Sequence, residues 1–469
     1  MSLALLVPEL ILAGMALALI LAARRIQQTP VAVAGTVLAA MAAALASVWV
    51  LSGGARAGFE GMIALDGYSQ FFKVLISATL ALAALLSVRN LDAEHVPRAE
   101  YHALLLLAST GMMLAVSSRD LLPLYLGLEL MTLCAYILVG IRVERQESNE
   151  AAIKYFLLGS FASAVLIYGI SLTYAVTGTT DFAGIASALS KHGTGSNLLL
   201  LVAIGLVAAG LAFKIAAVPM HAWAPDAYQG ASAPVAGFLA AGSKAVGLAA
   251  LGRVCLAAYG SEARVLSVVL AGLAGLSIVV GSIIALSQTD MKRLLAYSSI
   301  AHAGYALLGL IAGTGDGASA TMTYACFYVF MTLGTFGVVA ALGERGETLD
   351  GYRGLAAQRP GIALLMLLFL MSLTGIPPTA GFAAKFFVIL SAVRAGHIAL
   401  AVLAVACSVV SAFFYMRVAV LMYMNAPREP APSRFPAAMS AALAVAALVT
   451  LIGGISPGSL ARWAAPPIP

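Results

Sequence analysis

Three lysines lie inside apolar stretches that are each long enough to cross a membrane: Lys214, Lys244 and Lys385. A charged side chain at mid-membrane costs at least about 2.5–3.5 kcal/mol on insertion scales, and such residues usually face a polar interior and mark routes for ions or protons. Desolvation also favours loss of the proton from a buried ammonium group. For Lys244 and Lys385 the alternative is a side chain that extends to a membrane interface. The three lysines therefore predict proton exchange.

Glu129 lies near the centre of another apolar stretch, residues 120–141. A buried carboxylate stays charged beside a lysine, because the opposite charge offsets the cost of desolvation. If Glu129 pairs with Lys214, two interpretations remain open. The pair could be a static contact that fixes helix packing, although buried ion pairs rarely stabilise more than apolar packing does. It could instead be a switch, in which close approach holds the proton on Lys214 and separation releases it.

His302 lies in a stretch rich in hydroxyl groups, with Tyr297, Ser298 and Tyr305 close in the sequence. Histidine titrates near neutral pH, so this stretch suits a proton relay; a hydrogen-bonded packing role is the alternative. His221 could extend the route towards the cytoplasmic side. The predicted relay consists of Glu129, Lys214, Lys244, His302 and Lys385, with His221, Tyr297, Ser298 and Tyr305 as accessory candidates.

The composition places this chemistry in a membrane. Of the 469 residues, 62% are hydrophobic and only 10% are charged, against about 25% charged in soluble domains. The net charge of +6 comes from residues scattered singly through the chain, so it does not indicate nucleic-acid binding. The four cysteines stand alone, without the spacing of a metal, iron–sulfur or disulfide framework. Glycine motifs for nucleotides are also absent, so we expect no cofactor and no metal in this chain.

Runs of about 20 apolar residues between polar breaks predict an all-α polytopic membrane protein with about fourteen transmembrane helices. Only four residues, 117–120, separate the fourth run from the fifth. The predicted spans are residues 3–22, 31–52, 69–87, 102–118, 120–141, 151–176, 198–218, 233–257, 264–287, 295–313, 317–342, 361–392, 398–424 and 436–456.

The positive charges in the loops predict the orientation, because cytoplasmic loops carry an excess of lysine and arginine. Loops after odd-numbered spans hold Arg24 and Arg25; Arg89 and Arg98; Arg142 and Arg145; Lys292 and Arg293; Arg345, Arg353 and Arg359; Arg428 and Arg434. Loops after even-numbered spans hold little more than Arg56, Arg119, Lys191, Arg264 and Arg394. The odd-numbered loops should therefore be cytoplasmic and both termini periplasmic.

Two predicted spans are interrupted. Pro219 ends the seventh span, and Gly375, Pro377 and Pro378 lie in the middle of the twelfth. Proline removes a backbone donor and clashes with the preceding turn, so both helices must break. Broken backbone inside a membrane persists only where protein or a wet cavity surrounds it. Paired interrupted helices in corresponding positions indicate a transport site.

The two interrupted spans are five spans apart, which predicts two five-helix repeats, spans 4–8 and 9–13. Because five is odd, the repeats should be inverted relative to each other. We therefore expect one membrane domain over residues 1–469. Its parts would be a three-helix segment (1–100), a first repeat (101–258), a second repeat (259–424) and a C-terminal helix (425–469).

Three stretches resemble the antiporter-like membrane subunits of respiratory complex I, the bacterial NADH:quinone oxidoreductase. Residues 213–231, with the run Trp-Ala-Pro-Asp-Ala-Tyr-Gln-Gly, resemble the broken seventh helix of that family. Residues 291–305 are similar to its ninth-to-tenth connection, and residues 375–386 to its broken twelfth helix. The matches occur in order over nearly the whole chain. Met220 departs from the family, where an aromatic residue is common, but it is also apolar.

The resemblance implies a role for each main candidate. Glu129 and Lys214 match the family's modulating ion pair. Lys244 matches the central relay lysine, Lys385 the terminal proton-exchanging residue, and His302 falls on the connecting polar axis. NADH oxidation and quinone reduction, with FMN and iron–sulfur clusters, would take place in partner subunits. This chain would translocate protons across the bacterial inner membrane beside the other antiporter-like subunits, driven by its neighbours.

Two other functions remain as alternatives. A cation/proton antiporter subunit, part of a multi-subunit antiporter without redox chemistry, shares the fold and most of the motifs, so the lysines do not separate it from the first reading. A purely structural membrane scaffold would not explain several buried ionisable groups, each of which is costly in a membrane. The sequence therefore favours proton translocation.

Overall fold

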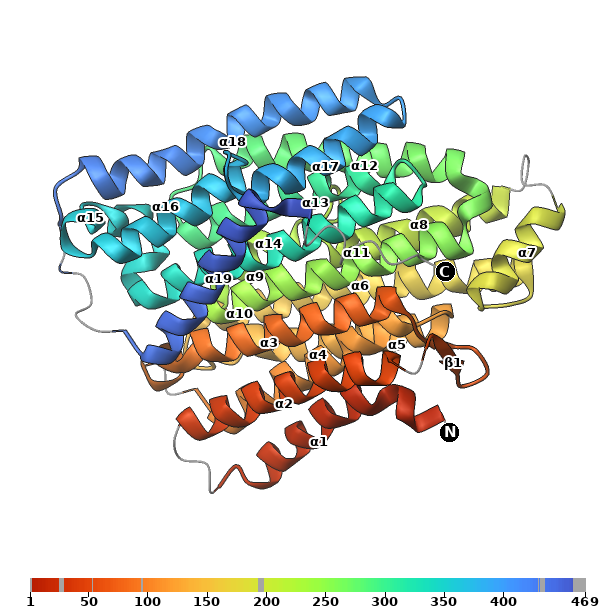
Figure 1. Cartoon of the computed structure of the whole chain (residues 1–469), viewed down its shortest axis with the longest axis horizontal. Coiled ribbons are helices and arrows are strands. Elements are labelled where there is room, and N and C mark those ends of the chain that lie inside the picture. Colours follow the sequence, from red (N-terminus) through yellow and green to blue (C-terminus); the bar gives the residue numbers. More distant parts are fainter. Residues whose placement is uncertain are drawn as a thin grey trace.

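The computed structural model describes residues 2–24, 29–52, 54–93, 96–192, 198–428, 430 and 435–458. Within these residues the chain is a bundle of long helices that run roughly side by side (Figure 1). Two arginines used to predict the orientation, Arg25 and Arg434, lie outside the described residues, as do parts of the predicted segments 1–100, 101–258 and 425–469.

The first part of the chain forms α1 (Val7–Leu21) after the short helix η1 (Ser2–Leu6), then α2 (Thr29–Leu51), α3 (Gly67–Ala93), α4 (Arg98–Ser117) and α5 (Leu121–Val139). An antiparallel hairpin of β1 (Arg56–Gly58) and β2 (Ile63–Leu65) joins α2 to α3, with Arg56 opposite Leu65. The middle part forms α6 (Gln146–Thr177), α7 (Phe182–His192), α8 (Leu198–Lys214), α9 (Trp223–Gly230), α10 (Ala233–Phe238), η2 (Leu239–Ser243), α11 (Lys244–Arg253), η3 (Val254–Ala258) and η4 (Gly260–Glu262).

The last part forms α12 (Ala263–Ala285), α13 (Met291–Leu310), α14 (Gly315–Leu342), η5 (Gly343–Glu347), η6 (Leu349–Tyr352), α15 (Leu355–Gln358), α16 (Pro360–Thr374), α17 (Ala380–Arg394), α18 (Ile398–Met424) and α19 (Ala437–Ile455). In Figure 1, α1 and α2 lie at one edge of the bundle and α18 lies at the opposite edge. Near-complete burial of α10, α11 and α14 places these helices at the centre.

Within the described residues, 11 helical stretches are long and apolar enough to cross a membrane. They coincide with predicted spans, and the other predicted spans coincide with α8, α13 and the pair α16–α17. The breaks at Pro219 and at Pro377–Pro378 shorten α8, α16 and α17. The all-α polytopic fold with two broken helices is therefore confirmed, while the count of fourteen stays a prediction. The hairpin and α7 were not predicted, because both are too short to give a strong periodic signal.

The two halves of the chain pack in a corresponding order. In the first half, α4 packs on α5, α5 on α6, and α6 on the broken helix α8–α9. In the second half, α12 packs on α13, α13 on α14, and α14 on the broken helix α16–α17. This order of neighbours is compatible with the predicted repeats, but the repeats and their inverted relation stay predictions. The C-terminal helix α19 packs back against α3, α14 and α17.

Glycines allow close backbone contacts between helices in both halves. A Cβ atom on Gly111 of α4 would lie 2.6 Å from the backbone oxygen of Gly127 of α5, and one on Gly281 of α12 would lie 2.5 Å from the backbone nitrogen of Ala301 of α13. Small residues at such contacts let backbones approach closely, which is a main source of helix association in membranes. The corresponding helix pairs α4–α5 and α12–α13 thus depend on the absence of a side chain.

Two buried ion pairs hold α3 in place. Lys73 of α3 lies 2.7 Å from a carboxylate oxygen of Glu9 of α1. Before α3, Asp66 accepts hydrogen bonds of 3.0 and 2.9 Å from the Arg253 guanidinium of α11. Burial acts to raise the pKa of the Asp66 carboxyl, but the charge and hydrogen bonds of Arg253, with those of Ser69, hold that pKa below its ordinary value. Asp66 therefore stays ionised and fixes one end of α11.

We expect Gly111→Ala to lower the thermal unfolding temperature of the purified protein. The added methyl group would force α4 away from α5, and overpacking of this kind costs about 1–3 kcal/mol. Gly205→Ala in α8 is the matched control, because a Cβ there would meet nothing within 4 Å. Equal unfolding temperatures for the two variants would contradict the backbone contact between α4 and α5.

Candidate functional site

The predicted ion pair is present between α5 and α8. The Lys214 ammonium donates hydrogen bonds to Glu129 Oε1 at 3.0 Å and to Thr132 Oγ1 at 2.8 Å. Ser163 of α6 donates to the same Glu129 oxygen at 2.6 Å. The Lys214 side chain is 2% exposed and that of Glu129 is 19% exposed. One carboxylate oxygen thus receives two donors, and Lys214 has the Thr132 hydroxyl as a second partner.

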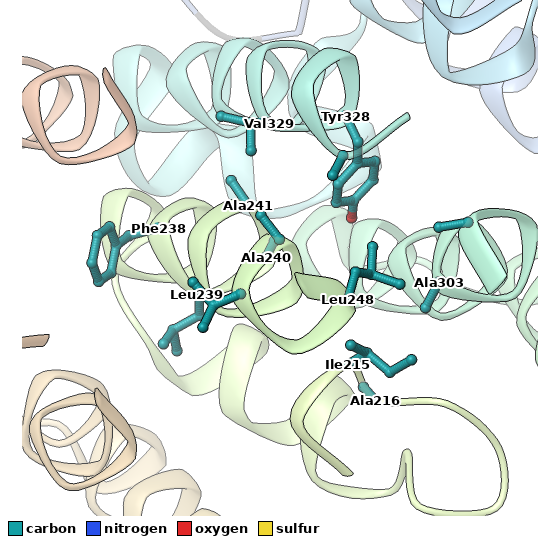
Figure 2. Close-up of a cluster of buried hydrophobic side chains, with 14 of the residues drawn as sticks. Ile215, Ala216, Phe238, Leu239, Ala240, Ala241, Leu248, Ala303, Tyr328 and Val329 are labelled. Atoms are coloured by element: carbon teal, nitrogen blue, oxygen red, sulfur yellow. The ribbon is translucent and has the colours of Figure 1, made fainter. Parts of the chain in front are cut away.

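Lys214 occupies the last position of α8, immediately before the break. Ala216 follows with a φ of 55°, a left-handed conformation that non-glycine residues adopt rarely. Figure 2 shows Ile215 and Ala216 next to Leu248 of α11, among fully buried side chains. A cation at a helix C-terminus is favoured by the partial negative charge of the free carbonyl groups there. The break therefore gives Lys214 a polar environment inside an apolar interior.

Side chains satisfy the backbone groups that this break sets free. The indole of Trp223 donates to the carbonyl oxygen of Phe213 at 3.0 Å. The amide of Val218 donates to the hydroxyl of Ser277 in α12 at 2.8 Å. Trp223 is held by a stacked contact with Tyr155 of α6, with ring centroids 4.3 Å apart. Because unsatisfied backbone groups in a membrane each cost several kcal/mol, these contacts make the break possible.

Lys244 is the first residue of α11 and follows η2, a wide helical turn of the π type. Such turns occur frequently at functional sites. The Lys244 side chain is buried, and its ammonium donates to Ser299 Oγ of α13 at 2.7 Å. Ser299 in turn donates to the carbonyl oxygen of Ala296 at 2.7 Å. The residue is 1% exposed, so its side chain ends inside the protein. No ion-pair partner for Lys244 lies among the described residues.

His302 lies one helical turn beyond Ser299 on α13, and hydroxyl groups lie at both of its ring nitrogens. Nδ1 is 2.6 Å from the Tyr324 hydroxyl of α14, and Nε2 is 3.4 Å from the Tyr415 hydroxyl of α18. Tyr415 is also hydrogen-bonded to Ser298. Each of these hydroxyls can both donate and accept. The imidazole can therefore take up a proton at one nitrogen and release one at the other.

Lys385 lies on α17, just after the second break. Its ammonium donates to the carbonyl oxygen of Thr374 at 2.9 Å and to Ser408 Oγ of α18 at 3.0 Å. It also lies 4.5 Å from the ring centroid of Tyr305. Gly375, with a φ of 90°, ends α16 and leaves the Thr374 carbonyl free. The side chain is 5% exposed, so it is held inside the protein and does not extend to an interface.

The accessory candidates divide into two groups. Ser298 and Tyr305 lie beside the candidate relay groups: Ser298 is hydrogen-bonded to Tyr415, and the Tyr305 ring lies next to the Lys385 ammonium. His221 only approaches the carbonyl oxygen of Pro219, at 3.2 Å, and Tyr297 lies under the guanidinium of Arg293. The structure brings neither His221 nor Tyr297 to the relay groups. The predicted route through His221 towards the cytoplasmic side therefore stays a prediction.

The sequence analysis did not identify several hydrogen-bond partners of the relay candidates, namely Thr132, Ser163, Tyr324, Ser408 and Tyr415. Isolated hydroxyl residues are common in membrane helices, so nothing in their local sequence marks them. The sequence analysis also missed the pair Glu9–Lys73. A signal for it existed, since both residues are charged and lie inside predicted spans. His102 of α4, buried and hydrogen-bonded to Thr36 at 3.0 Å, was missed in the same way.

A polar pocket of about 280 Å³ lies at the end of the molecule predicted to be cytoplasmic. Arg142, Lys154, Asp226, Lys292 and Glu347 line it beside Gly230. Asp226 pairs with Arg293 at 2.7 Å and with Lys154 at 3.3 Å, and Lys292 pairs with Glu347 at 2.7 Å. The described part of the chain holds no group of three or more metal-ligating side chains.

The chain is similar to known proteins over almost its whole length. Residues 118–411 match the family model described as NADH:quinone oxidoreductase/Mrp antiporter, TM. A relative in Desulfovibrio desulfuricans, named NADH-quinone oxidoreductase subunit N, is 44% identical over 98% of this chain and 95% of its own length. The likeness between the three sequence stretches and complex I subunits thus extends to the whole sequence.

Two solved structures share the fold. A chain of respiratory complex I from Thermus thermophilus is 36% identical, with a TM-score of 0.82 over 98% of this chain and 100% of that chain. A chain of the Mrp complex from Dietzia is 23% identical, with a TM-score of 0.87 over 99% of this chain and 97% of that chain. The second likeness concerns the fold alone, because fold similarity does not by itself imply a shared function.

We expect Trp223→Phe to destabilise the broken helix without removing the aromatic contact with Tyr155. The phenyl ring keeps the stacking but cannot donate to the Phe213 carbonyl, which would retain only the Ala216 amide as donor. The loss of one buried hydrogen bond costs about 0.5–1.5 kcal/mol. The measurement is the thermal unfolding temperature of the purified protein. Trp49→Phe is the control, because Trp49 is 72% exposed. If both variants unfold like the unaltered protein, Trp223 does not support the break.

Proposed function

The chain belongs to the family of membrane subunits that NADH:quinone oxidoreductase shares with Mrp antiporters, and on this premise we propose how its buried groups move protons. It is a multi-pass integral membrane protein and a proton-translocating subunit of NADH:quinone oxidoreductase. The residues that carry the proton are our proposal: Glu129, Lys214, Lys244, His302 and Lys385.

One observation carries the proposal. Lys244 and Lys385 are buried in the centre of the protein, and neither has a carboxylate partner among the described residues. Instead, each ammonium has neutral partners, namely Ser299 for Lys244 and Thr374 with Ser408 for Lys385. An unpaired buried ammonium is costly, and losing its proton removes that cost. Neutral oxygen partners can hold either form of the lysine, which is what proton exchange requires.

Helix α13 links the two lysines. Ser299 and His302 lie one turn apart on it, and Tyr305 follows one turn later beneath Lys385. We propose that a proton passes from Lys244 through Ser299 towards His302 and on to Lys385. Water would bridge the steps that no hydrogen bond between side chains covers, since water-mediated contacts are nearly as favourable as direct ones.

The pair Glu129–Lys214 would set the direction of transfer. While the carboxylate holds the Lys214 ammonium at 3.0 Å, the proton stays on the lysine. If Glu129 withdraws, Thr132 remains as a neutral partner and the proton can be released towards Lys244. The α8 end that carries Lys214 adjoins α11, because Gly247 of α11 packs against Ile215. A conformational signal at Glu129 could thus reach Lys244 through direct packing.

The wider setting is also proposed. Energy would come from quinone reduction in partner subunits, where FMN, iron–sulfur clusters and quinone would bind, beside other antiporter-like subunits. The arginines and lysines of odd-numbered loops support a cytoplasmic location for those loops and a periplasmic location for both termini, in a bacterial inner membrane. The polar pocket at Asp226 and Lys292 would then be where protons enter from the cytoplasm.

We expect Lys244→Met to reduce this subunit's share of the proton uptake at least tenfold. The reason is that methionine has a similar volume to lysine but no exchangeable proton. Sealed vesicles that contain the whole enzyme allow proton uptake and NADH oxidation to be measured together. Lys191→Met is the control, since Lys191 lies exposed on α7. Unchanged proton uptake per NADH oxidised in Lys244→Met would refute the relay.

Glu129→Gln and Lys214→Met should each lower pumping, and the double variant should lose little more than the worse single variant. This non-additivity is expected because both residues act through one contact. The measurement is a double-mutant cycle on proton uptake in the same vesicles. Independent, additive losses would show that the pair is a static packing contact and not a switch.

A further inference from the structure

A pocket outside the proposed relay lies between α14 and α17, at the end of the molecule opposite the polar pocket beside Gly230. It has a volume of about 410 Å³, within the range of about 300–1,000 Å³ typical of small-molecule sites. Four of its lining residues carry the argument: Asp316, Phe387, Leu390 and Arg394. Nothing in the proposed transfer of protons uses these residues.

The mouth of the pocket carries one charge of each sign. Asp316 lies in the first turn of α14 and Arg394 is the last residue of α17, and both are exposed. Neither side chain has a hydrogen-bond or ion-pair partner within the described part of the chain. Two free and opposite charges at one opening match a ligand that itself carries both charges.

The inner wall is partly apolar and continues into a membrane-facing surface. Phe387 and Leu390 line the pocket on α17, which extends inward from Arg394 over seven residues, or about 10 Å. Leu390 lies one turn from Phe386, and Phe382, Phe386 and Val393 form an exposed apolar face on the same helix. An exposed apolar face on a membrane helix suits contact with hydrocarbon chains. The pocket therefore opens beside the lipid phase, at the depth where a helix end meets the headgroups.

We propose that this pocket binds a phospholipid whose headgroup carries both a phosphate and an amine. The Arg394 guanidinium would bind the phosphate, for which its planar donor groups are well suited. The Asp316 carboxylate would bind the ammonium group, and the first carbons of an acyl chain would lie along Leu390 and Phe387. Free phosphate has neither an ammonium group to bind Asp316 nor an acyl chain to contact the apolar wall. A purely anionic headgroup would be repelled by Asp316.

The test uses the whole enzyme, purified in mild detergent, stripped of lipid and then titrated with lipids. Native mass spectrometry counts bound lipid after addition of phosphatidylethanolamine, phosphatidylglycerol or inorganic phosphate. Arg394→Gln should weaken binding of both lipids at this site at least tenfold. Asp316→Asn should weaken phosphatidylethanolamine selectively and leave phosphatidylglycerol equal or stronger. Arg264→Gln is the matched control, because Arg264 is exposed at the same end of the molecule but does not line the pocket.

Ala320→Phe provides a second approach, because Ala320 lines the pocket and a phenyl ring would fill it. We expect this variant to lose the same lipid as Arg394→Gln. Equal lipid retention in Arg394→Gln, Arg264→Gln and the unaltered enzyme would overturn the proposal. So would binding of inorganic phosphate alone with the same dependence on Arg394. Loss of a neighbouring subunit from Ala320→Phe, with lipid retention unchanged, would make the pocket a subunit contact and also refute it.

Lipid counting does not depend on proton transfer. Lys244→Met should retain the lipid at this site even when it no longer pumps, so failure of the relay and failure of the lipid site can be told apart.

Discussion

The central constraint of this structure is the cost of an ammonium group buried in a membrane protein without a matching carboxylate. Lys214 has Glu129 as its counter-charge, whereas Lys244 and Lys385 have only neutral oxygen atoms near them among the described residues. Hydroxyl groups of neighbouring helices supply two of these oxygens, Ser299 Oγ and Ser408 Oγ, and a helix break supplies the third. The break after α16 frees the Thr374 carbonyl for Lys385, and the break after α8 places Lys214 at a helix C-terminus. Each of the two helix interruptions therefore helps to stabilise the buried lysine next to it.

Breaking a helix inside a membrane creates a second cost, which the packing around each break offsets. Trp223 and Ser277 satisfy backbone groups at the first break. At the second break, the hydroxyl of Ser372 accepts from the Gly381 amide at 3.0 Å, and Thr379 donates to the carbonyl of Ile376 at 2.7 Å. These residues do not carry protons in our proposal. They keep the irregular backbone stable enough for the lysines to remain in place.

The sequence predicted more of the fold than of the site. Long apolar runs and prolines act locally, so the helices and both breaks could be predicted. The pairing of Glu129 with Lys214 could be anticipated because each needs an opposite charge. Thr132 and Ser408, by contrast, look like many other hydroxyl residues. Thr132 becomes a lysine partner only because the end of α8 points the Lys214 side chain at α5, and Ser408 only because α18 packs on α17. The route through His221 towards the cytoplasmic side stays a prediction, because sequence closeness to Pro219 does not show which proton-accepting group His221 would meet.

The sequence by itself determined two features that are energetically unfavourable in a membrane. These are the charged groups inside membrane spans and the prolines that must interrupt two of the spans. Those features follow from residue type and position alone, and they sufficed to indicate a membrane protein with a proton-exchange chemistry. The tertiary structure decided which oxygen each buried lysine meets and that α13 lies between Lys244 and Lys385. Contacts between side chains on different helices depend on the rotation and depth of each helix in the bundle. Close backbone packing at residues such as Gly111 and Gly281 sets both, and it acts between segments far apart in the chain.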